Sequence, residues 1–135
     1  MSTQIFVNLP VKDLDASKAF YTALGYTVNE QFTDENASSI VVSDTIYVML
    51  LTEEFAKQFT NKSVADATAT TEVINALSVD SRAEVDRLAD AAFAAGATPV
   101  KDAQEEGGFM YSRSFADLDG HQWEVLFMDP TAFEG

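Results

Sequence analysis

Glu124 is the residue of this sequence with the clearest capacity for chemistry. It is an acid within the otherwise apolar segment Gln122–Met128, which reads as a β-strand. Burial in such a strand disfavours the charge of a carboxylate and prepares it to act as a general base. The turn sequence Asp117–Gly120 folds the chain back and is predicted to bring Arg113 roughly opposite Glu124. Two roles therefore stay open for Glu124, a base at a site or one half of a structural ion pair.

Three further polar side chains are candidates for holding a ligand. Arg113 is the last Lys or Arg of the chain and is suited to an anionic substrate group, unless it only neutralises Glu124. Tyr111 and Asn8 are predicted to face a cavity, where each either orients a ligand or closes a backbone hydrogen bond. His121, directly after the turn glycine, has the opposite strand parity to Glu124 and is expected at the surface.

The elements that must position these residues follow from alternation and from turn residues. Strands are predicted at Ile5–Val11, Thr27–Phe32, Ser39–Val42, Ile46–Leu51, Glu72–Val79, Thr98–Val100, Phe109–Phe115 and Gln122–Met128. Helices are predicted to start after the caps Asp13 and Ser81 and to end at Gly25 and Gly96. Pro10 indicates that the first strand lies at a sheet edge or that Pro10 is near the end of the strand.

The predicted elements repeat. Leu9–Val11 matches Leu77–Val79, and each is followed by a helix, a glycine and further strands. One such unit cannot cover its own sheet, so two are expected to pair. We predict one α+β domain, 1–135, of two βαβββ modules (about 1–52 and 71–135) with a connector (about 53–70), which together form a curved mixed sheet around a cavity.

Strand alternation sorts the side chains between the helices and this cavity. Val7, Leu9 and Val11 are predicted to pack on the helices. The cavity side is expected to carry Phe6, Asn8, Tyr47, Met49, Leu51, Gln122, Glu124, Leu126 and Met128. A second short helix is predicted within Glu53–Phe59, and Glu105–Gly108 is predicted to be a flexible loop near the cavity mouth.

Composition excludes several classes of partner. With 8 Lys or Arg and 22 Asp or Glu, the net charge is −14, which repels nucleic acid and anionic membranes but attracts cations. The chain has no Cys and one His, so thiolate sites are excluded and a two-His iron site lacks ligands. No segment approaches the length of a membrane span, and the first residues lack a signal-peptide pattern, so a cytoplasmic protein is expected.

Several runs of residues resemble the vicinal-oxygen-chelate superfamily, which includes glyoxalase I, extradiol dioxygenases, and the bleomycin and fosfomycin resistance proteins. They are NLPVKDL at Asn8–Leu14, SKAFY at Ser17–Tyr21, LGY at Leu24–Tyr26 and FADLDGHQWEV at Phe115–Val125. The sequence is most similar to the predicted lactoylglutathione lyase branch. The resemblance covers both modules and implies the paired βαβββ fold and a homodimer.

The resemblance also implies where metal-dependent members take their ligands, at two strand positions in each module. Those positions are Phe6 and Met49 in the first module and Ile74 and Glu124 in the second. Three of the four are apolar here, so we expect no metal and no other cofactor.

We therefore predict a metal-free small-molecule binding protein of the glyoxalase/bleomycin resistance type, with an apolar, aromatic or cationic ligand. Its predicted ligand-binding residues are Phe6, Asn8, Met49, Ile74, Tyr111, Arg113 and Glu124. The alternative is an enzyme, a glyoxalase-like lyase or isomerase that uses Glu124 as metal ligand or general base. A third reading is a vestigial site on a protein that only binds another protein, and the sequence leaves the choice between enzyme and binding protein open.

Overall fold

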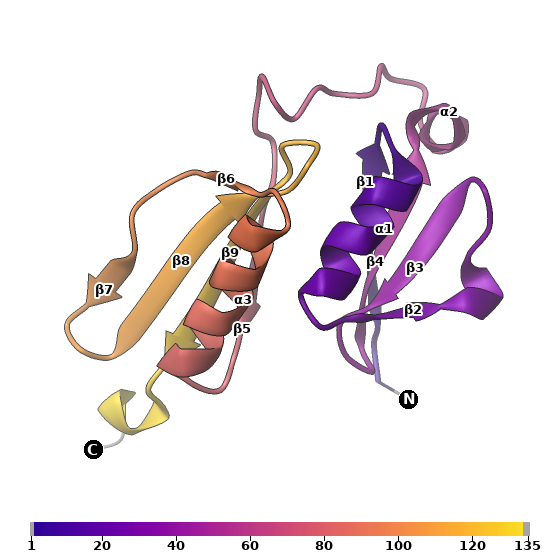
Figure 1. The fold of residues 1–135 in the computed structure, drawn as a ribbon. Helices are drawn as coiled ribbons and strands as arrows, with labels where there is room; N and C mark the ends of the chain where they lie inside the picture. Colours follow the sequence, from indigo (N-terminus) through magenta and orange to yellow (C-terminus); the bar gives the residue numbers. More distant parts are fainter. Residues whose placement is uncertain (1, 134–135) are drawn as a thin grey trace. The chain divides into compact units, whose positions relative to one another are not determined.

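The computed structural model describes residues 2–133 of the chain. The chain divides into two compact units, Met1–Asp66 and Ala67–Gly135, and the boundary falls in the predicted connector. Each unit combines one sheet with a helix of at least ten residues, as Figure 1 shows in indigo to magenta for unit 1 and in pink to yellow for unit 2. The predicted α+β class and repeated order of elements are confirmed.

Unit 1 is a four-stranded sheet with the strand order β1-β4-β3-β2, covered on one face by α1. Its elements are β1 (Ile5–Val11), α1 (Leu14–Ala23), β2 (Thr27–Asn29), the 3-10 helix η1 (Glu30–Phe32), β3 (Ala37–Val41), β4 (Ile46–Thr52), α2 (Glu53–Ala56) and η2 (Lys57–Phe59). The parallel β1 and β4 are joined through the rest of the unit, whereas the other neighbours are antiparallel. Its buried apolar side chains include Leu9, Val11, Phe20, Tyr21, Leu24, Ile40, Val48 and Leu50.

Local signals explain most boundaries of unit 1. The Asp13 side chain accepts a hydrogen bond from the amide of Ala16 and starts α1, as predicted. Gly25 has a φ of 104°, which lets the chain turn out of the helix at no steric cost. β1 is at an edge of this sheet, in agreement with the position of Pro10.

The predicted strand Thr27–Phe32 is wrong in its second half. The side chain of Asn29 accepts a hydrogen bond from the amide of Gln31 and starts η1, so β2 ends at Asn29. A hydrogen bond between an Asn side chain and the backbone two residues on favours a turn over strand pairing, and in this segment the turn forms instead of the strand.

Unit 2 repeats the arrangement around α3. Its elements are β5 (Ile74–Ser78), α3 (Arg82–Ala94), β6 (Thr98–Pro99), β7 (Gln104–Glu106), β8 (Met110–Ala116), β9 (Gln122–Met128) and the 3-10 helix η3 (Pro130–Phe133), with the strand order β5-β9-β8-β6 and with β7 also paired to β8. Ser81 caps α3 by accepting from the amide of Glu84, as predicted. Val85, Leu88, Ala89 and Ala92 form the buried face of this helix.

The predicted flexible loop at Glu105–Gly108 is also wrong in part. Glu105 lies in β7, where it pairs with Tyr111 of β8 in an antiparallel ladder. The turn covers Gly107 to Phe109, and the φ values of Gly107 and Gly108, 55° and 77°, favour glycine. Two consecutive glycines supply a tight turn, so the acidic residues before them can join the sheet.

Within residues 2–133, no helix has the length and apolar character that crossing a membrane requires.

Candidate functional site

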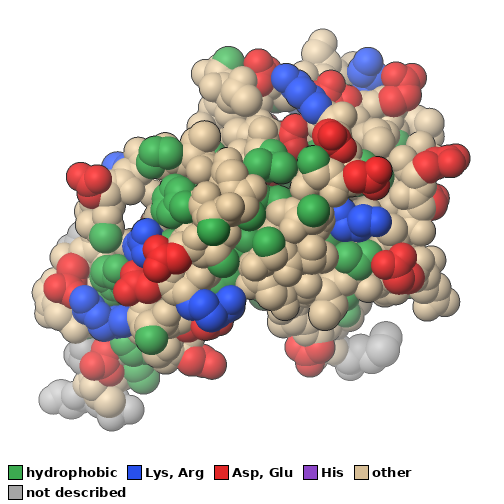
Figure 2. Space-filling model, in the orientation of Figure 1, with side chains coloured by type: hydrophobic (Ala, Val, Ile, Leu, Met, Phe, Trp, Pro, Cys, Tyr) green, Lys and Arg blue, Asp and Glu red, His purple; other side chains and the backbone are tan. Residues whose placement is uncertain are grey.

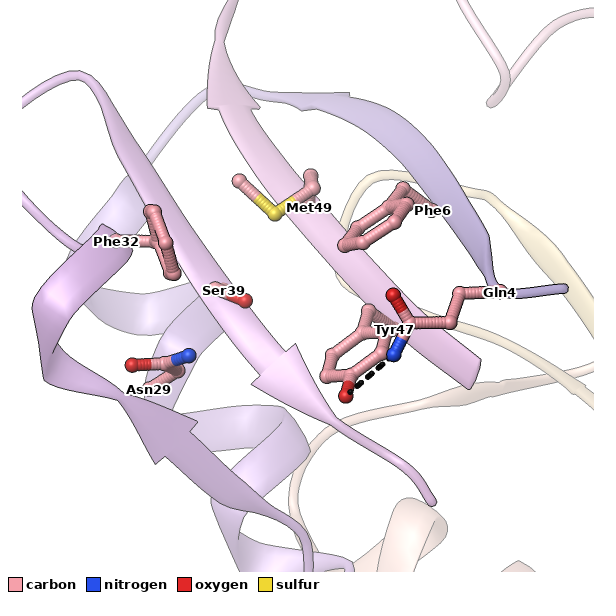
Figure 3. A pocket seen from close by; sticks show the side chains of 7 residues that line it. All are labelled: Gln4, Phe6, Asn29, Phe32, Ser39, Tyr47 and Met49. Atoms are coloured by element: carbon pink, nitrogen blue, oxygen red, sulfur yellow. Dashed lines mark hydrogen bonds between the residues drawn. The ribbon is translucent and has the colours of Figure 1, made fainter. Parts of the chain in front are cut away.

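A pocket lies on the sheet face of unit 1 that points away from α1, called the open face below. Its volume is about 500 Å³, and side chains from both edges and the centre of the sheet surround it (Figure 3). The lining residues are Gln4, Phe6, Asn29, Phe32, Ser39, Tyr47 and Met49.

Strand register brings these side chains to one face. Phe6 of β1 pairs with Tyr47 of β4, and Met49 of β4 pairs with Ser39 of β3. Ser39 in turn pairs with Asn29 at the end of β2. Partners in register point to the same side of a sheet, so four strands contribute neighbouring side chains to the open face.

The pocket wall is largely aromatic. The rings of Phe6 and Tyr47 stack with their centroids 4.9 Å apart and an interplanar angle of 11°. Phe6 keeps 50% of its surface exposed and Phe32 keeps 63%, which is unusual for such large apolar side chains. Figure 3 shows Phe32 across the pocket from the Phe6–Tyr47 stack, with Met49 between them. The arrangement is a ready surface for a flat apolar molecule.

The polar groups at one end of the pocket are already bonded to each other. Gln4 Nε2 donates to the backbone oxygen of Asp44 (3.2 Å) and to Tyr47 Oη (3.4 Å). Tyr47 Oη donates to the same Asp44 oxygen (3.2 Å). These bonds hold the Tyr47 ring in place beneath Phe6.

The opposite end is held by η1. Thr33 Oγ1 donates to the backbone oxygen of Asn29 (2.8 Å) and accepts from the amide of Ser39 (3.1 Å). One hydroxyl therefore ties both ends of η1 to β3. Phe32, the residue before Thr33, is in this way held over the open face.

The structure brings together two of the predicted site residues, Phe6 and Met49, at this pocket. Asn8 pairs with Met49 but is exposed, and its Nδ2 donates to the backbone oxygen of Phe6 (3.0 Å). Leu51 also lies on the open face, but at the end of β4 away from the pocket. There it is buried in a cluster with Ala37 and with Ala56 of α2.

Sequence reasoning missed several lining residues. Gln4 precedes the first predicted strand, so strand alternation does not assign its side chain to a face. Asn29 and Phe32 fall within the predicted strand Thr27–Phe32, and Ser39 is only the first residue of the predicted strand Ser39–Val42. The segment Asn29–Phe32 carried one usable signal, an Asn two residues before an amide it can cap.

Glu124 in unit 2 faces away from α3 and is half-buried. Its cross-strand partners are Ser114 of β8 and Ala76 of β5. Ser114 is 7% exposed, and its Oγ has no hydrogen-bond partner among the described residues. Ile74 lies on the same face of β5 and is 49% exposed.

The predicted ion pair between Arg113 and Glu124 is wrong. The β8–β9 register pairs Arg113 with Val125, so Arg113 and Glu124 point to opposite faces of the sheet. A shift of one residue in the expected pairing exchanges the two faces. Arg113 Nη1 instead donates to the carboxylates of Asp86 (3.1 Å) and Asp90 (2.9 Å) on α3.

Tyr111 was expected to face the cavity but points toward α3 with Arg113. Its hydroxyl donates to Asp86 Oδ1 at 2.6 Å, and the guanidinium of Arg82 lies 4.4 Å from the centre of its ring. Arg82 also pairs with Glu105 of β7. Figure 2 shows the basic and acidic side chains interleaved over α3 and β8.

These contacts shift two ionisation equilibria. The hydrogen bond from Tyr111, followed by that from Arg113, lowers the pKa of Asp86 below its ordinary value against the opposing effect of burial. The same bond to Asp86 raises the pKa of Tyr111, and burial adds to the rise. The paired groups hold α3 to β8.

The residues at the four implied metal positions do not fit a metal. Phe6 and Ile74 offer no donor atom, and the thioether of Met49 suits soft ions rather than the hard or borderline divalent ions that carboxylates bind. Glu124 alone supplies oxygen. Across residues 2–133, no three His, Cys, Asp or Glu side chains cluster closely enough to hold an ion.

Comparison with known proteins places this geometry among related folds. The family model for the Bleomycin resistance protein-like N-terminal region matches residues 3–43. A hypothetical protein from S. aureus is 32% identical, with a TM-score of 0.77 over 94% of this chain and 95% of that one. A glyoxalase-related enzyme from Fulvimarina pelagi is 21% identical, with a TM-score of 0.79 over 94% and 88%.

A fosfomycin resistance protein from Mesorhizobium loti is 15% identical, with a TM-score of 0.69 over 98% of this chain and 97% of that one. At these lower identities the likeness concerns the fold. No curated protein matches the chain.

Proposed function

We propose that this chain is a member of the glyoxalase/bleomycin resistance/dioxygenase superfamily and a small-molecule binding protein that works without a metal and takes an apolar or aromatic ligand. The observation that carries the proposal is the open-face pocket, lined by the exposed rings of Phe6 and Phe32. Its volume of about 500 Å³ is in the usual range for ligand pockets.

The character of the lining favours binding over catalysis. None of the seven lining residues is charged. General acid–base catalysis most often uses His, Asp, Glu or Lys, and the lining has none of these; its one titratable side chain, Tyr47, donates its hydroxyl hydrogen to the backbone oxygen of Asp44. The net charge of −14 adds a long-range attraction for cationic ligands, without a specific ion pair in the pocket.

A thermal-shift and titration screen tests the proposal with three naphthalene-sized probes, one neutral, one cationic (N-methylquinolinium) and one anionic (naphthalene-2-sulfonate). The neutral and cationic probes should stabilise the protein, and the anion should bind more weakly. Phe6→Ala should weaken binding of the neutral probe about fivefold or more, because an aromatic contact contributes about 1 kcal/mol beyond its buried area.

Phe59→Ala is the matched control. Phe59 is in the same unit, is 69% exposed, and touches Phe55 rather than the pocket. This variant should bind the neutral probe as the unaltered protein does. If no probe binds, or if both variants lose affinity equally, the proposed pocket is not the binding site.

Other predicted features belong to the same proposal. Asn8, Ile74 and Glu124 stay as predicted ligand contacts, to be tested by the same titration after substitution, whereas Tyr111 and Arg113 point toward α3 and are not proposed as contacts. A cytoplasmic homodimer that binds neither nucleic acid nor membrane is the expected context, and light scattering of the purified protein measures its mass.

The second candidate is a lyase or isomerase of the lactoylglutathione lyase type that uses Glu124 as general base or metal ligand. The observation in its favour is the half-buried Glu124 opposite Ser114, whose buried hydroxyl lacks a partner among the described residues. Turnover of lactoylglutathione that Glu124→Gln abolishes would establish it. Stoichiometric metal in protein purified without chelator would overturn the metal-free proposal.

A further inference from the structure

We infer that the pocket of unit 1 selects flat aromatic molecules that carry a hydrogen-bond acceptor at one edge, such as an aryl carbonyl, and that the amide of Asn29 recognises this acceptor. The inference rests on the proposed function and names its ligand class.

Asn29 has one half of its amide engaged, and the other half has no hydrogen-bond partner within residues 2–133. Its Oδ1 accepts from the amide of Gln31 (3.1 Å), which fixes the orientation of the side chain. Its Nδ2 carries two donor hydrogens. Figure 3 shows this nitrogen on the side of Asn29 that faces Ser39 and the pocket. The cap that begins η1 therefore also aims a donor at the ligand.

Ser39 supports the same end of the pocket. It is the register partner of Asn29, is 2% exposed, and its hydroxyl lies at the pocket floor (Figure 3). Thr33 binds both the Asn29 carbonyl and the Ser39 amide, so the two residues are held together at a fixed spacing. A donor and a hydroxyl on rigid backbone give a directional polar site.

The rest of the lining leaves the acceptor no competing site. Tyr47 Oη gives its hydrogen to Asp44, and Gln4 Nε2 is shared between Asp44 and Tyr47. Phe6, Phe32 and Met49 offer only apolar or weakly polar surface. A flat ring against Phe6 and Phe32 thus has its polar edge directed toward Asn29.

A pair of probes of nearly equal shape tests the inference. 2-Acetylnaphthalene has a carbonyl acceptor, and 2-isopropenylnaphthalene has a CH2 group in place of the carbonyl oxygen. We expect the acetyl compound to bind the unaltered protein about fivefold to tenfold more tightly in an NMR titration, the effect of one net hydrogen bond.

Asn29→Asp is the decisive variant. It retains the oxygen that caps η1 but replaces the donor nitrogen with an acceptor oxygen, so η1 should persist in the NMR spectrum while the preference for the acetyl compound disappears. Asn36→Asp is the matched control, since Asn36 is exposed in the same unit, lies outside the pocket lining and gains the same charge. It should keep the preference.

The outcomes separate this inference from the function on which it rests. If neither probe binds the unaltered protein, the proposed function itself fails. If both probes bind with equal affinity, the pocket binds aromatic rings but the acceptor plays no part, and the inference is overturned. It is equally overturned if the preference survives in Asn29→Asp.

Discussion

Replacing Tyr111 with Phe should loosen unit 2 without affecting the pocket of unit 1. The change removes only the hydroxyl that donates to Asp86 at 2.6 Å and keeps the ring under Arg82. A hydrogen bond to a charged partner contributes about 1.5–3 kcal/mol when it is buried. The Asp86 side chain is 47% exposed, so solvent screening should reduce the effect to about 1 kcal/mol.

Urea unfolding followed by tryptophan fluorescence measures this difference in the correct unit. The chain has one Trp, Trp123, which is 3% exposed in β9 of unit 2. With a urea dependence of about 2 kcal/mol per molar, a loss of about 1 kcal/mol lowers the midpoint by about 0.5 M. The affinity of the unit 1 pocket for 2-acetylnaphthalene should be the same in Tyr111→Phe as in the unaltered protein.

The effect should depend on pH in a defined direction. The pKa of Asp86 is lowered in the folded protein, so the stabilisation it provides is complete above its ordinary value of 3.8 and is lost as the pH falls through the lower, folded value. The pKa of Tyr111 is raised, so its contribution is complete below 10.0 and is lost as the pH rises through the higher, folded value. The difference between Tyr111→Phe and the unaltered protein should therefore be constant from about pH 5 to 9 and shrink on either side.

Tyr47→Phe provides the control, because the hydroxyl of Tyr47 donates to a neutral backbone oxygen in unit 1. The stability difference between Tyr47→Phe and the unaltered protein should not shrink as the pH falls below about 5. An unchanged midpoint in Tyr111→Phe, or an undiminished difference at about pH 3, would refute the role given to this bond. A loss of probe affinity without a loss of stability would instead restore Tyr111 as a ligand contact.

Two further substitutions test the packing. Gly120→Ala should lower the free energy of unfolding in urea by about 2–4 kcal/mol, because φ is 87° and an added Cβ would lie 2.7 Å from the backbone of Ala67. Gly108→Ala, with φ 77° and no atom within 4 Å of the added Cβ, should show only the backbone strain of about 1–2 kcal/mol. Equal losses in the two variants would contradict the close approach at Gly120. Ile40→Ala, at a side chain with 0% exposure, should lower the stability of unit 1 by about 2–5 kcal/mol in thermal unfolding, whereas Ile74→Ala, at 49% exposure, should have a small effect.

The order of elements could be predicted because its signals are local. Asp13 and Ser81 cap the two main helices as expected, and Gly25 and Gly96 follow their ends with positive φ. Each signal involves a side chain and a backbone group a few residues apart. Such contacts depend little on the rest of the fold, so the sequence alone indicates them.

The polar contacts of unit 2 could not be predicted in the same way. In the β8–β9 hairpin the Asp117 amide donates to the carbonyl of His121, and the register that follows sets Ser114, not Arg113, across from Glu124. A difference of one residue in a turn is within the uncertainty of any sequence pattern, yet it exchanges the faces of every side chain beyond it. The sequence does not indicate Asp86 as the partner of Arg113, because the two residues lie 27 positions apart in the chain.

The two units share a topology but use their open faces differently. Phe6 and Met49 occupy the open face of β1 and β4 in unit 1, whereas Ala76 and Glu124 occupy the corresponding face of β5 and β9 in unit 2. Neither set packs against α1 or α3, whose buried partners point the other way. Substitution of the exposed side chains on the open faces therefore leaves the helix-packed cores intact and costs little stability. This separation explains how one fold persists down to 15% identity among neighbours described as a glyoxalase-related enzyme and a fosfomycin resistance protein. It also explains why function in this chain must be argued from Phe6, Asn29 and their neighbours rather than from the fold.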